Sequence, residues 1–403
     1  MYMRTRYIYI FSCLIGVIGI IACSEKKGSE YTPWGESMEK QTINCDNNSF
    51  SFSDILANGE LIMLTTSGPD TYFDYHGQGM GTQYLLCEKF AQKIGVSLRV
   101  DVCKTKEEMI NKLKKGEADI IACQMPRNEK GTLPCGYKND AQKTSWVVEE
   151  KSKELADSIN SWYKPEMLAS IKKEESLRYS SRSIHRHTYA PMLNAKAGVI
   201  SKYDQLFMKY APLARWDWRL LAAQCYQESC FDPKAYSWAG ACGLMQIMPS
   251  TAAHLGLQIE NIYNPEENIY ASVRYIVELN HYFQDVRNYR ERQFYVLASY
   301  NGGYFHIRDA MSLAKKYGKN QYVWNDVAEF VIKLSQPQFY NDPVVKYGYM
   351  RGQETAGYVD RIRDRWTQYR GIASGYRGLG NFNGFTPGGD IPHKAKRKNR
   401  FHL

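Results

Sequence analysis

Residues 217–249 read DWRLLAAQCYQESCFDPKAYSWAGACGLMQIMP, and this stretch decides how the rest of the chain is interpreted. The pattern predicts a helix that begins at Asp217 and ends near a glutamate, followed by a tight loop and a Gly-rich turn. Asp217 is expected to cap the helix, because its carboxylate can accept an unpaired backbone N–H of the first turn. Leu221, Cys225 and Glu228 recur at i, i+4 and i+7, which places Glu228 on an apolar face. Such a face raises the pKa of a carboxyl group, and a raised pKa suits a general acid near neutral pH.

The N-terminus has the pattern of an export signal. Arginines precede an apolar stretch from Tyr7 to Ile21, and Ala22-Cys23 follows it. The pattern resembles a bacterial lipoprotein signal, which implies a signal peptide over 1–22, acylation of Cys23 and a polar tether over 23–49. A retained membrane anchor is the alternative, but the apolar run is short for a span of roughly 20 residues. Both interpretations predict an exported protein, and the lipid anchor predicts a place in the cell envelope, at the outer membrane facing the periplasm.

The net charge of the chain indicates what kind of partner it binds. The formal net charge is +10 at pH 7, which favours an anionic partner. In an exported chain that partner is expected to be anionic lipid or a cell-wall polymer, and no nucleic acid is expected.

Cysteine usage bears on disulfides and metals. Of the ten cysteines, Cys13 and Cys23 belong to the signal and the acylation site, which leaves eight. An even number in an exported chain permits disulfides. A bridge between Cys230 and Cys242 would brace the loop after Glu228, although unpaired thiols remain the alternative, and Cys225 is expected to be a small core residue. No cysteine or histidine cluster has zinc spacing, so neither a metal nor a cofactor is expected.

Strand and helix patterns alternate over residues 50–175. The expected strands are 61–65, 98–103, 118–123 and 145–149, and the expected helices are 83–94, 106–115 and 151–173. Alternation of this kind predicts βαβ units on a parallel sheet.

The same region resembles the type II periplasmic solute-binding module. The resemblance lies in ANGELIMLT (57–65), GTQYLLCEKFAQKIGV (81–96) and KLKKGEADIIAC (112–123). At about 125 residues the region is shorter than a two-lobed module, so it is expected to be truncated and its small ligand stays unknown. Arg127 occupies the place where that family often has a carboxylate-binding arginine, and a surface arginine at a strand end is an equally good interpretation.

The remainder divides into a linker, a helical domain and a tail. Residues 176–200 are polar, basic and Ser-rich and predict a linker, in which His185 and His187 are expected to be solvated. Residues 201–370 predict an all-α domain, and 371–403 form a Gly-rich, basic tail. The expected helices are 203–211, 217–229, 250–255, 265–283, 290–299, 304–316, 324–334 and 354–370.

Four blocks of the helical domain carry a second resemblance. They are AAQCYQES (222–229), SWAGACGLMQIMP (237–249), LASYNGG (297–303) and RGQETAGYV (351–359). In this order and spacing they resemble the lytic transglycosylase family with the lysozyme-like fold. The resemblance implies an α+β multidomain protein, with an α/β solute-binding-like domain before an all-α lysozyme-like one. It also implies an enzyme that cleaves the β-1,4 bond between N-acetylmuramic acid and N-acetylglucosamine in peptidoglycan and forms 1,6-anhydro-N-acetylmuramic acid.

The resemblance assigns roles residue by residue. Glu228 would be the catalytic acid and then the base. The residues expected to bind the glycan or to orient Glu228 are Ser237, Gly243, Met245, Gln246, Tyr300, Asn301 and Tyr358. Most glycosidases need two carboxylates. Asp232 precedes Pro233 in a predicted turn and is expected to be a turn former rather than a second acid.

Three alternatives remain open at this point. A hydrolytic muramidase of the goose-lysozyme type would need a second acid to activate water. A non-catalytic peptidoglycan-binding or sensing lipoprotein would need a degenerate site, whereas Glu228 and its polar set are intact. The N-terminal region could also act as a ligand sensor that regulates the enzyme.

Overall fold

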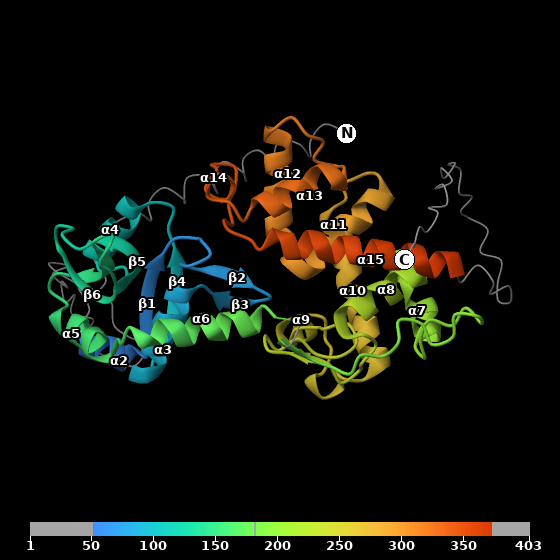
Figure 1. The fold of residues 1–403 in the computed structure, drawn as a ribbon, viewed down its shortest axis with the longest axis horizontal. Helices are drawn as coiled ribbons and strands as arrows, with labels where there is room; N and C mark the ends of the chain where they lie inside the picture. Colours follow the sequence, from blue (N-terminus) through green and yellow to red (C-terminus); the bar gives the residue numbers. More distant parts are fainter. Residues whose placement is uncertain (1–50, 181–182, 373–403) are drawn as a thin grey trace, which may run out of the picture. The chain divides into compact units, whose positions relative to one another are not determined.

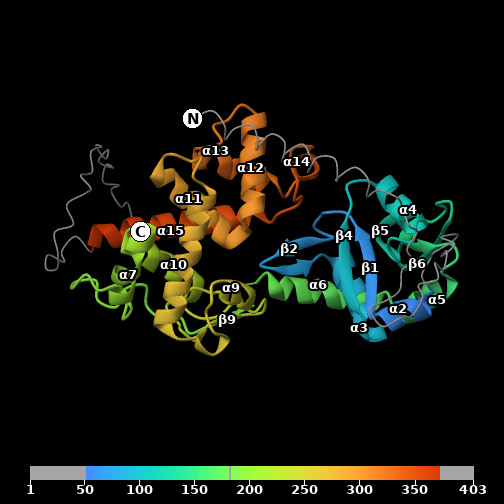
Figure 2. The same ribbon diagram turned by 180° about the vertical axis from the view of Figure 1, so that it is seen from behind.

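The computed structural model describes residues 51–180 and 183–372 (Figures 1 and 2). The expected signal peptide, Cys23, the tether and the tail beyond Ile372 lie outside these residues. Among the described residues, no helix combines the length and the apolarity needed to cross a membrane.

The first part of the described chain is an α/β domain. Its elements in order are α2 (Phe52–Asn58), β1 (Glu60–Thr65), β2 (Phe73–Tyr75), β3 (Gln78–Met80), α3 (Thr82–Ile94), β4 (Ser97–Val102), α4 (Lys106–Lys114), β5 (Ile120–Pro126), β6 (Thr132–Asn139), β7 (Thr144–Glu149), α5 (Lys153–Trp162) and α6 (Glu166–Arg178). The five-stranded sheet has the order β4-β1-β5-β7-β6. Side chains of β1 alternate between its faces, so that Met63 packs in the core cluster that contains α3 and α5, and Leu64 packs in the cluster that contains α4.

The sheet is mixed, so the expectation of a parallel sheet is only partly right. Strands β4, β1 and β5 are parallel, but β7 is antiparallel to both β5 and β6. Strand β6 escaped the sequence analysis because Pro134 and Gly136 interrupt its apolar pattern. The register shifts between Cys135 and Lys138, and Gly136 adopts a φ of +58°, as a bulge allows.

Two further differences have local causes. The helix expected over 151–173 is divided into α5 and α6, because Pro165 disfavours a helical conformation at the residue before it. A short hairpin of β2 and β3 was missed. Its turn is His76-Gly77, with φ of +54° and +74°, which is the conformation that two-residue hairpins favour.

The second part of the described chain is a helical domain, as predicted. Its elements are β8 (Ile184–His185), α7 (Asp204–Tyr210), η2 (Ala211–Ala214), α8 (Trp218–Ser229), β9 (Tyr236–Ser237), α9 (Pro249–His254), η3 (Ile259–Asn261), α10 (Pro265–Tyr282), α11 (Tyr289–Gly302), α12 (Tyr304–Lys316), α13 (Trp324–Lys333), α14 (Pro337–Tyr340) and α15 (Gly352–Ile372). The long helix α15 packs along α8, and the two share one core (Figure 1).

The expected linker is more structured than its composition suggests. Helix α6 continues to Arg178, and β8 pairs with β9, so that Ile184 lies opposite Ser237. Ile184 and His185 are therefore part of the helical domain, because they pair with its strand β9.

Helix α8 begins and ends where the sequence predicts. The Asp217 carboxylate accepts a hydrogen bond from the Arg219 backbone N–H at 3.0 Å, and its second oxygen accepts one from Trp366 Nε1 on α15 at 3.0 Å. The helix ends because Cys230 and Phe231 both adopt left-handed conformations, with φ of +52° and +64°. Asp217 thus caps α8 and fastens it to α15.

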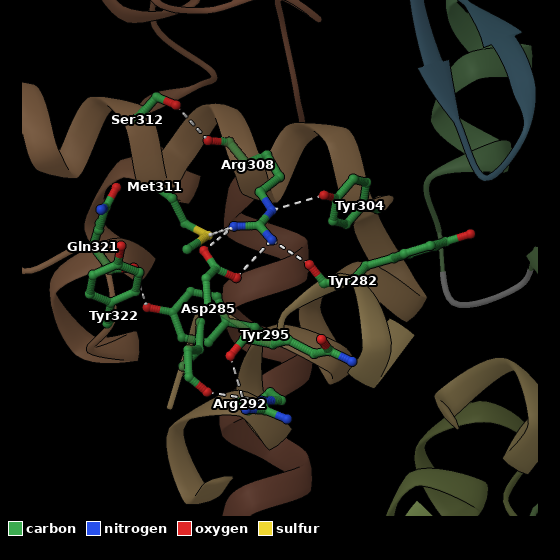
Figure 3. A network of polar contacts seen from close by, with 12 residues as sticks. Tyr282, Asp285, Arg292, Tyr295, Tyr304, Arg308, Met311, Ser312, Gln321 and Tyr322 are labelled. Atoms are coloured by element: carbon green, nitrogen blue, oxygen red, sulfur yellow. Dashed lines mark hydrogen bonds and ion pairs between the residues drawn. The ribbon is translucent and has the colours of Figure 1, made fainter. Parts of the chain in front are cut away.

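A polar network fixes α12 against the end of α10 (Figure 3). The Arg308 guanidinium donates to both carboxylate oxygens of Asp285, at 2.6 and 2.9 Å, and to the Tyr282 carbonyl. Arg308 Nε also donates to the Tyr304 hydroxyl at 3.0 Å. Planar, two-pronged contacts of this kind constrain orientation as well as distance, so the first turn of α12 is held in place.

Candidate active site

A cavity of about 450 Å³ opens at the end of α8. The residues of the helical domain that line it include Glu228, Ser237, Gln246, Tyr300, Asn301, Phe305, His306 and Tyr347. The four sequence blocks therefore meet: each of them contributes residues to this cavity or to its wall. Five residues named from the sequence line it directly, and Tyr358, Met245 and Gly243 lie behind its surface.

Glu228 is the centre of the cavity's chemistry. Its side chain is half-buried, while Leu221 and Cys225 on the same helical face are fully buried. Tyr358, which is 3% exposed, donates its hydroxyl hydrogen to Glu228 Oε1 at 2.5 Å. Burial raises the pKa of the Glu228 carboxyl to about 7, although the hydrogen bond from Tyr358 lowers it part of the way. Both protonation states of Glu228 are therefore populated near neutral pH.

Arg186 supports the end of the catalytic helix. Its Nη1 donates to the carbonyl oxygen of Glu228 at 2.7 Å and to that of Gln227 at 3.3 Å. The last carbonyls of a helix lack partners within the helix, and a cation there also offsets the negative end of the helix dipole. The sequence does not indicate this role, because Arg186 lies in a polar stretch without helical or strand periodicity.

Tyr300 and Asn301 enter the cavity from the end of α11. The Tyr300 hydroxyl donates its hydrogen to the Met245 carbonyl at 2.8 Å, so this hydrogen is not available to Glu228. Asn301 Oδ1 accepts a hydrogen bond from Thr355 Oγ1 at 2.8 Å. The Asn301 side-chain NH₂ is the half of that amide left to donate toward a ligand in the cavity.

Ser237 and Gln246 belong to the loop between α8 and α9. Ser237 Oγ accepts a hydrogen bond from the Ala241 N–H at 3.0 Å, which leaves its hydroxyl hydrogen able to donate elsewhere. Gln246 Nε2 donates to the carbonyls of Ala235 and Gly243, at 3.2 and 3.0 Å, while its Oε1 is buried without a partner among the described residues. Gln246 also has a φ of +48°, a left-handed conformation that is uncommon for a residue with a side chain.

Gly243 and Met245 lie inside the protein and away from the cavity surface. A Cβ at Gly243 would come within 2.5 Å of Asn268 Nδ2 and 2.8 Å of the Ile262 carbonyl, and its φ is +78°. Met245 is fully buried, and its backbone N–H donates to Asn268 Oδ1 at 2.8 Å. The close approach expected of Gly243 is therefore to Asn268 rather than to a glycan, and Met245 forms core rather than a cleft floor.

Asp232 has the turn role expected from the sequence. Its Oδ2 accepts from the His187 backbone N–H at 2.6 Å, and its Oδ1 accepts from the Lys234 N–H at 2.9 Å. These contacts commit both carboxylate oxygens to backbone groups, and Asp232 does not line the cavity.

Two other acids line the cavity, which the sequence analysis did not foresee. The Tyr75 hydroxyl contacts both carboxylate oxygens of Glu354, at 2.9 and 2.8 Å, and His76 Nε2 lies 3.5 Å away. Burial raises the pKa of Glu354, but the contacts with His76 and Tyr75 more than offset burial and hold this pKa below its ordinary value. Asp74 Oδ1 accepts a hydrogen bond from the Gly77 N–H at 3.1 Å. Both oxygens of Glu354 are thus in contact with Tyr75, whereas Asp74 has one oxygen bonded to Gly77, and burial raises the pKa of its carboxyl.

Cys230 and Cys242, which the sequence left open as a bridge, are not joined. Both thiols are free, and Cys242 Sγ lies 3.2 Å from the Tyr263 hydroxyl instead. Cys225 is fully buried in the core, as expected. Within the described ranges, no group of three His, Cys, Asp or Glu side chains could hold a metal ion.

Arg127 does not present a free guanidinium. Its Nη2 donates to Asp140 Oδ1 at 2.5 Å, and its Nε donates to the Thr144 carbonyl at 3.3 Å. These contacts tie the end of β5 to the β6–β7 turn, which agrees with the interpretation of Arg127 as a surface arginine at a strand end.

Part of the helical domain matches a known protein family. Residues 205–323 match the family model of the transglycosylase SLT domain. This range contains Glu228, Tyr300 and Asn301, and it ends before Tyr358.

The chain is also similar to curated proteins over longer ranges. It is 27% identical over 412 residues to membrane-bound lytic murein transglycosylase F of Desulfosudis oleivorans, a match that covers 76% of this chain and 89% of the relative. It is 33% identical to the protein of that name from Pseudomonas fluorescens, over 56% of this chain and 46% of the relative. The chain thus spans most of the first relative and about half of the second.

Two solved structures match single parts of the chain. One is the arginine-bound form of domain 1 from TmArgBP, with 24% identity over 27% of this chain and 94% of that chain, and a TM-score of 0.25. The other is the 70 kDa soluble lytic transglycosylase from Escherichia coli, with 25% identity over 42% of this chain and 24% of that chain, and a TM-score of 0.29. The described chain therefore consists of an α/β domain followed by a helical domain, and residues 205–323 of the helical domain match the transglycosylase SLT domain.

Proposed function

We propose that this protein is a peptidoglycan lytic transglycosylase. It cleaves the β-1,4 bond between N-acetylmuramic acid and N-acetylglucosamine and releases a 1,6-anhydro-N-acetylmuramic acid end. The observation that carries the proposal is Glu228, a half-buried carboxyl in the cavity with a pKa near 7 and a hydrogen bond from Tyr358. The SLT domain and the similarity to murein transglycosylases supply the substrate class.

The proposed reaction uses Glu228 twice. The protonated carboxyl first donates its proton to the glycosidic oxygen as the C1–O bond breaks. The 2-acetamido oxygen of the same sugar stabilises C1 as an oxazolinium-like species. The Glu228 carboxylate then takes the proton of the C6 hydroxyl, whose oxygen bonds to C1 as the bond between C1 and the acetamido oxygen breaks and the amide is restored. A pKa of about 7 suits both steps, because neither form is strongly favoured at neutral pH.

The cavity wall offers groups to hold the sugar during these steps. The free half of the Asn301 amide can donate to the acetamido carbonyl, and the Ser237 hydroxyl can donate to a second sugar oxygen. The Tyr358 hydroxyl holds Oε1 of Glu228, which leaves Oε2 as the oxygen directed to the substrate. Tyr300 contributes indirectly, because its hydrogen bond to the Met245 carbonyl holds the backbone next to Gln246.

Hydrolysis is the alternative, and it requires a second carboxylate free to activate water. Asp74 lines the cavity with one oxygen bonded to the Gly77 N–H, and Glu354 is the second candidate. The Tyr75 hydroxyl and His76 already occupy its oxygens, and a pKa below the ordinary value makes it a weak base. The contacts and the lowered pKa of Glu354 therefore argue against its use as the base, and product analysis decides whether Asp74 activates water.

Product analysis tests the function. Purified protein is incubated with intact murein sacculi, and the released muropeptides are separated and weighed by mass spectrometry. We expect products one water lighter than those that a muramidase releases from the same sacculi. Products with reducing ends would support the hydrolytic alternative, and no release at all would support a binding or sensing role.

We also propose that the protein is a lipoprotein of the cell envelope, anchored through Cys23, with the outer membrane as its site. The sequence from Tyr7 to Cys23 supports this, and the relatives are named membrane-bound. Cys23→Ala is expected to move the full-length protein from the membrane pellet to the soluble fraction and to remove incorporation of labelled palmitate. Retention of both signals in the variant would contradict the lipid anchor.

A further inference from the structure

Two exposed aromatic side chains stand at the margin of the active-site cavity. The rings of Phe305 and Tyr347 stack with their centroids 4.4 Å apart and their planes at 18°. Phe305 is 53% exposed and Tyr347 is 47% exposed, and both line the cavity that contains Glu228. Neither residue has a part in the reaction proposed above. Exposed aromatic rings that touch each other beside a cavity form a contiguous apolar surface, which is a feature of ligand-binding grooves.

The pair is held in position before any ligand arrives. Phe305 lies in the first turn of α12, which Arg308 fastens to the end of α10 (Figure 3). The buried Asp309 carboxylate accepts hydrogen bonds from the backbone N–H groups of Lys346 and Tyr347, at 2.7 to 3.1 Å. One helix therefore carries Phe305 and also secures the loop that carries Tyr347. A rigid aromatic stack loses little conformational freedom on binding.

A polar group accompanies the stack. His306 follows Phe305 in the sequence, lines the same cavity, and lies with its ring 6.4 Å from that of Tyr347. Its Nδ1 is buried and has no hydrogen-bond partner among the described residues. Burial lowers the pKa of the imidazole to about 4, so His306 is neutral at neutral pH, with one donor and one acceptor nitrogen.

We infer that Phe305 and Tyr347 form a saccharide platform, a subsite that stacks against one sugar ring of the glycan strand away from the bond being cleaved. A pyranose presents C–H groups on its flat faces and hydroxyls around its edge. The faces complement the electron-rich surface of an aromatic ring, and the edge can meet a neutral imidazole. Glu228 and this pair line the same cavity, so one strand can contact both. This inference rests on the proposed function, because the same cavity must hold a glycan.

The platform predicts that affinity grows with strand length. Full-length protein carrying Glu228→Gln, which binds without turning over, is titrated calorimetrically with peptide-free glycan strands of increasing length from the same murein. Affinity is expected to increase once the strand reaches the platform. Adding Phe305→Ala is expected to weaken binding of long strands by about 5- to 20-fold and to leave the shortest binding strand within about twofold.

Matched variants separate stacking from a general structural effect. Tyr347→Phe keeps the ring and is expected to retain the gain with length, whereas Tyr347→Ala is expected to lose it. Tyr270→Ala is the control. Tyr270 is also an exposed tyrosine that packs against a second aromatic ring, since its ring centroid lies 5.1 Å from that of Tyr210, but it does not line the cavity. Circular dichroism confirms that each variant is folded.

The possible outcomes distinguish the two proposals. If the affinity of both alanine variants still increases with glycan strand length as in the parent protein, the platform is overturned and the proposed function stays intact. If the active protein releases no anhydro products and the Glu228→Gln protein binds no strand of any length, the proposed function falls and the platform falls with it.

Discussion

Glu228→Gln is expected to reduce the release of anhydro-muropeptides by at least about 10³-fold. The amide keeps the shape of the carboxyl and can still accept the hydrogen bond from Tyr358, but it can neither donate the proton to the glycosidic oxygen nor accept the proton of the C6 hydroxyl. Initial rates on murein sacculi measure the effect. Glu267→Gln, an exposed glutamate on α10, is the matched control and should keep the wild-type rate. A Glu228→Gln protein that digests murein as fast as the wild type would remove the catalytic assignment.

The same substitution should make the protein more stable at alkaline pH. The ordinary carboxyl pKa of 4.5 is raised to about 7 in the folded state, so the folded protein binds the proton more tightly than the unfolded chain does. The stability that Glu228 contributes is thus complete below about pH 4.5 and is lost as the pH rises through 7. Glutamine carries no charge, so it should gain about 1–2 kcal/mol over the wild type at pH 8 and little at pH 4.5.

Thermal denaturation at the two pH values checks this prediction. The variant is expected to melt a few degrees above the wild type at pH 8 and at nearly the same temperature at pH 4.5. A gain confined to acid pH would mean that the pKa of Glu228 is lowered rather than raised. Activity and stability should therefore change in opposite directions, which a merely misfolded variant cannot imitate.

Tyr358→Phe is expected to move the pH profile and to slow the reaction by about tenfold. Loss of the hydroxyl removes a hydrogen bond that favours the charged carboxylate, so the pKa of Glu228 should rise further above 7. At about 1 kcal/mol for the hydrogen bond, the descending limb of kcat/KM should shift to higher pH by about 0.7 units. The rate falls because Oε1 also loses the contact that orients it.

A matched control exists in the same core. Tyr295 is fully buried and its hydroxyl donates to the Gln321 carbonyl at 2.9 Å, away from the cavity (Figure 3). Tyr295→Phe should lower stability by a similar amount and leave the pH profile in place. If Tyr358→Phe shifts the limb to lower pH, or leaves it where it was, the hydrogen bond does not act on Glu228 as proposed.

The sequence was most informative where a single physical rule decided the structure. Helix α12 occupies the predicted range 304–316, because its apolar period is undisturbed and the Gly302-Gly303 pair marks its start. Helix α8 begins after the predicted cap Asp217, and the raised pKa of Glu228 follows from the apolar face on which the sequence places it.

Other features depend on tertiary contacts that leave no mark on local sequence. Arg186 reaches the end of α8 from a stretch whose composition indicates only a linker. Residues Gly243 and Met245 belong to a block that resembles the lytic transglycosylase family, but membership of a motif does not distinguish a side chain that lines a cavity from one that packs behind it. Pro134 and Gly136 interrupt the apolar alternation of β6, so local sequence does not predict this strand. It forms because it pairs with β7.

Cleavage in water enriched with a heavy oxygen isotope tests most directly whether the C6 hydroxyl or water attacks C1. If the C6 hydroxyl closes on C1 with Glu228 as its base, the new anhydro ends carry oxygen only from the glycan, and the product masses are the same as in ordinary water. A muramidase run beside it on the same sacculi labels every new reducing end and shows that the label can be detected. Incorporation of one heavy oxygen per cleavage by this protein would contradict the central claim, because water would then be the nucleophile.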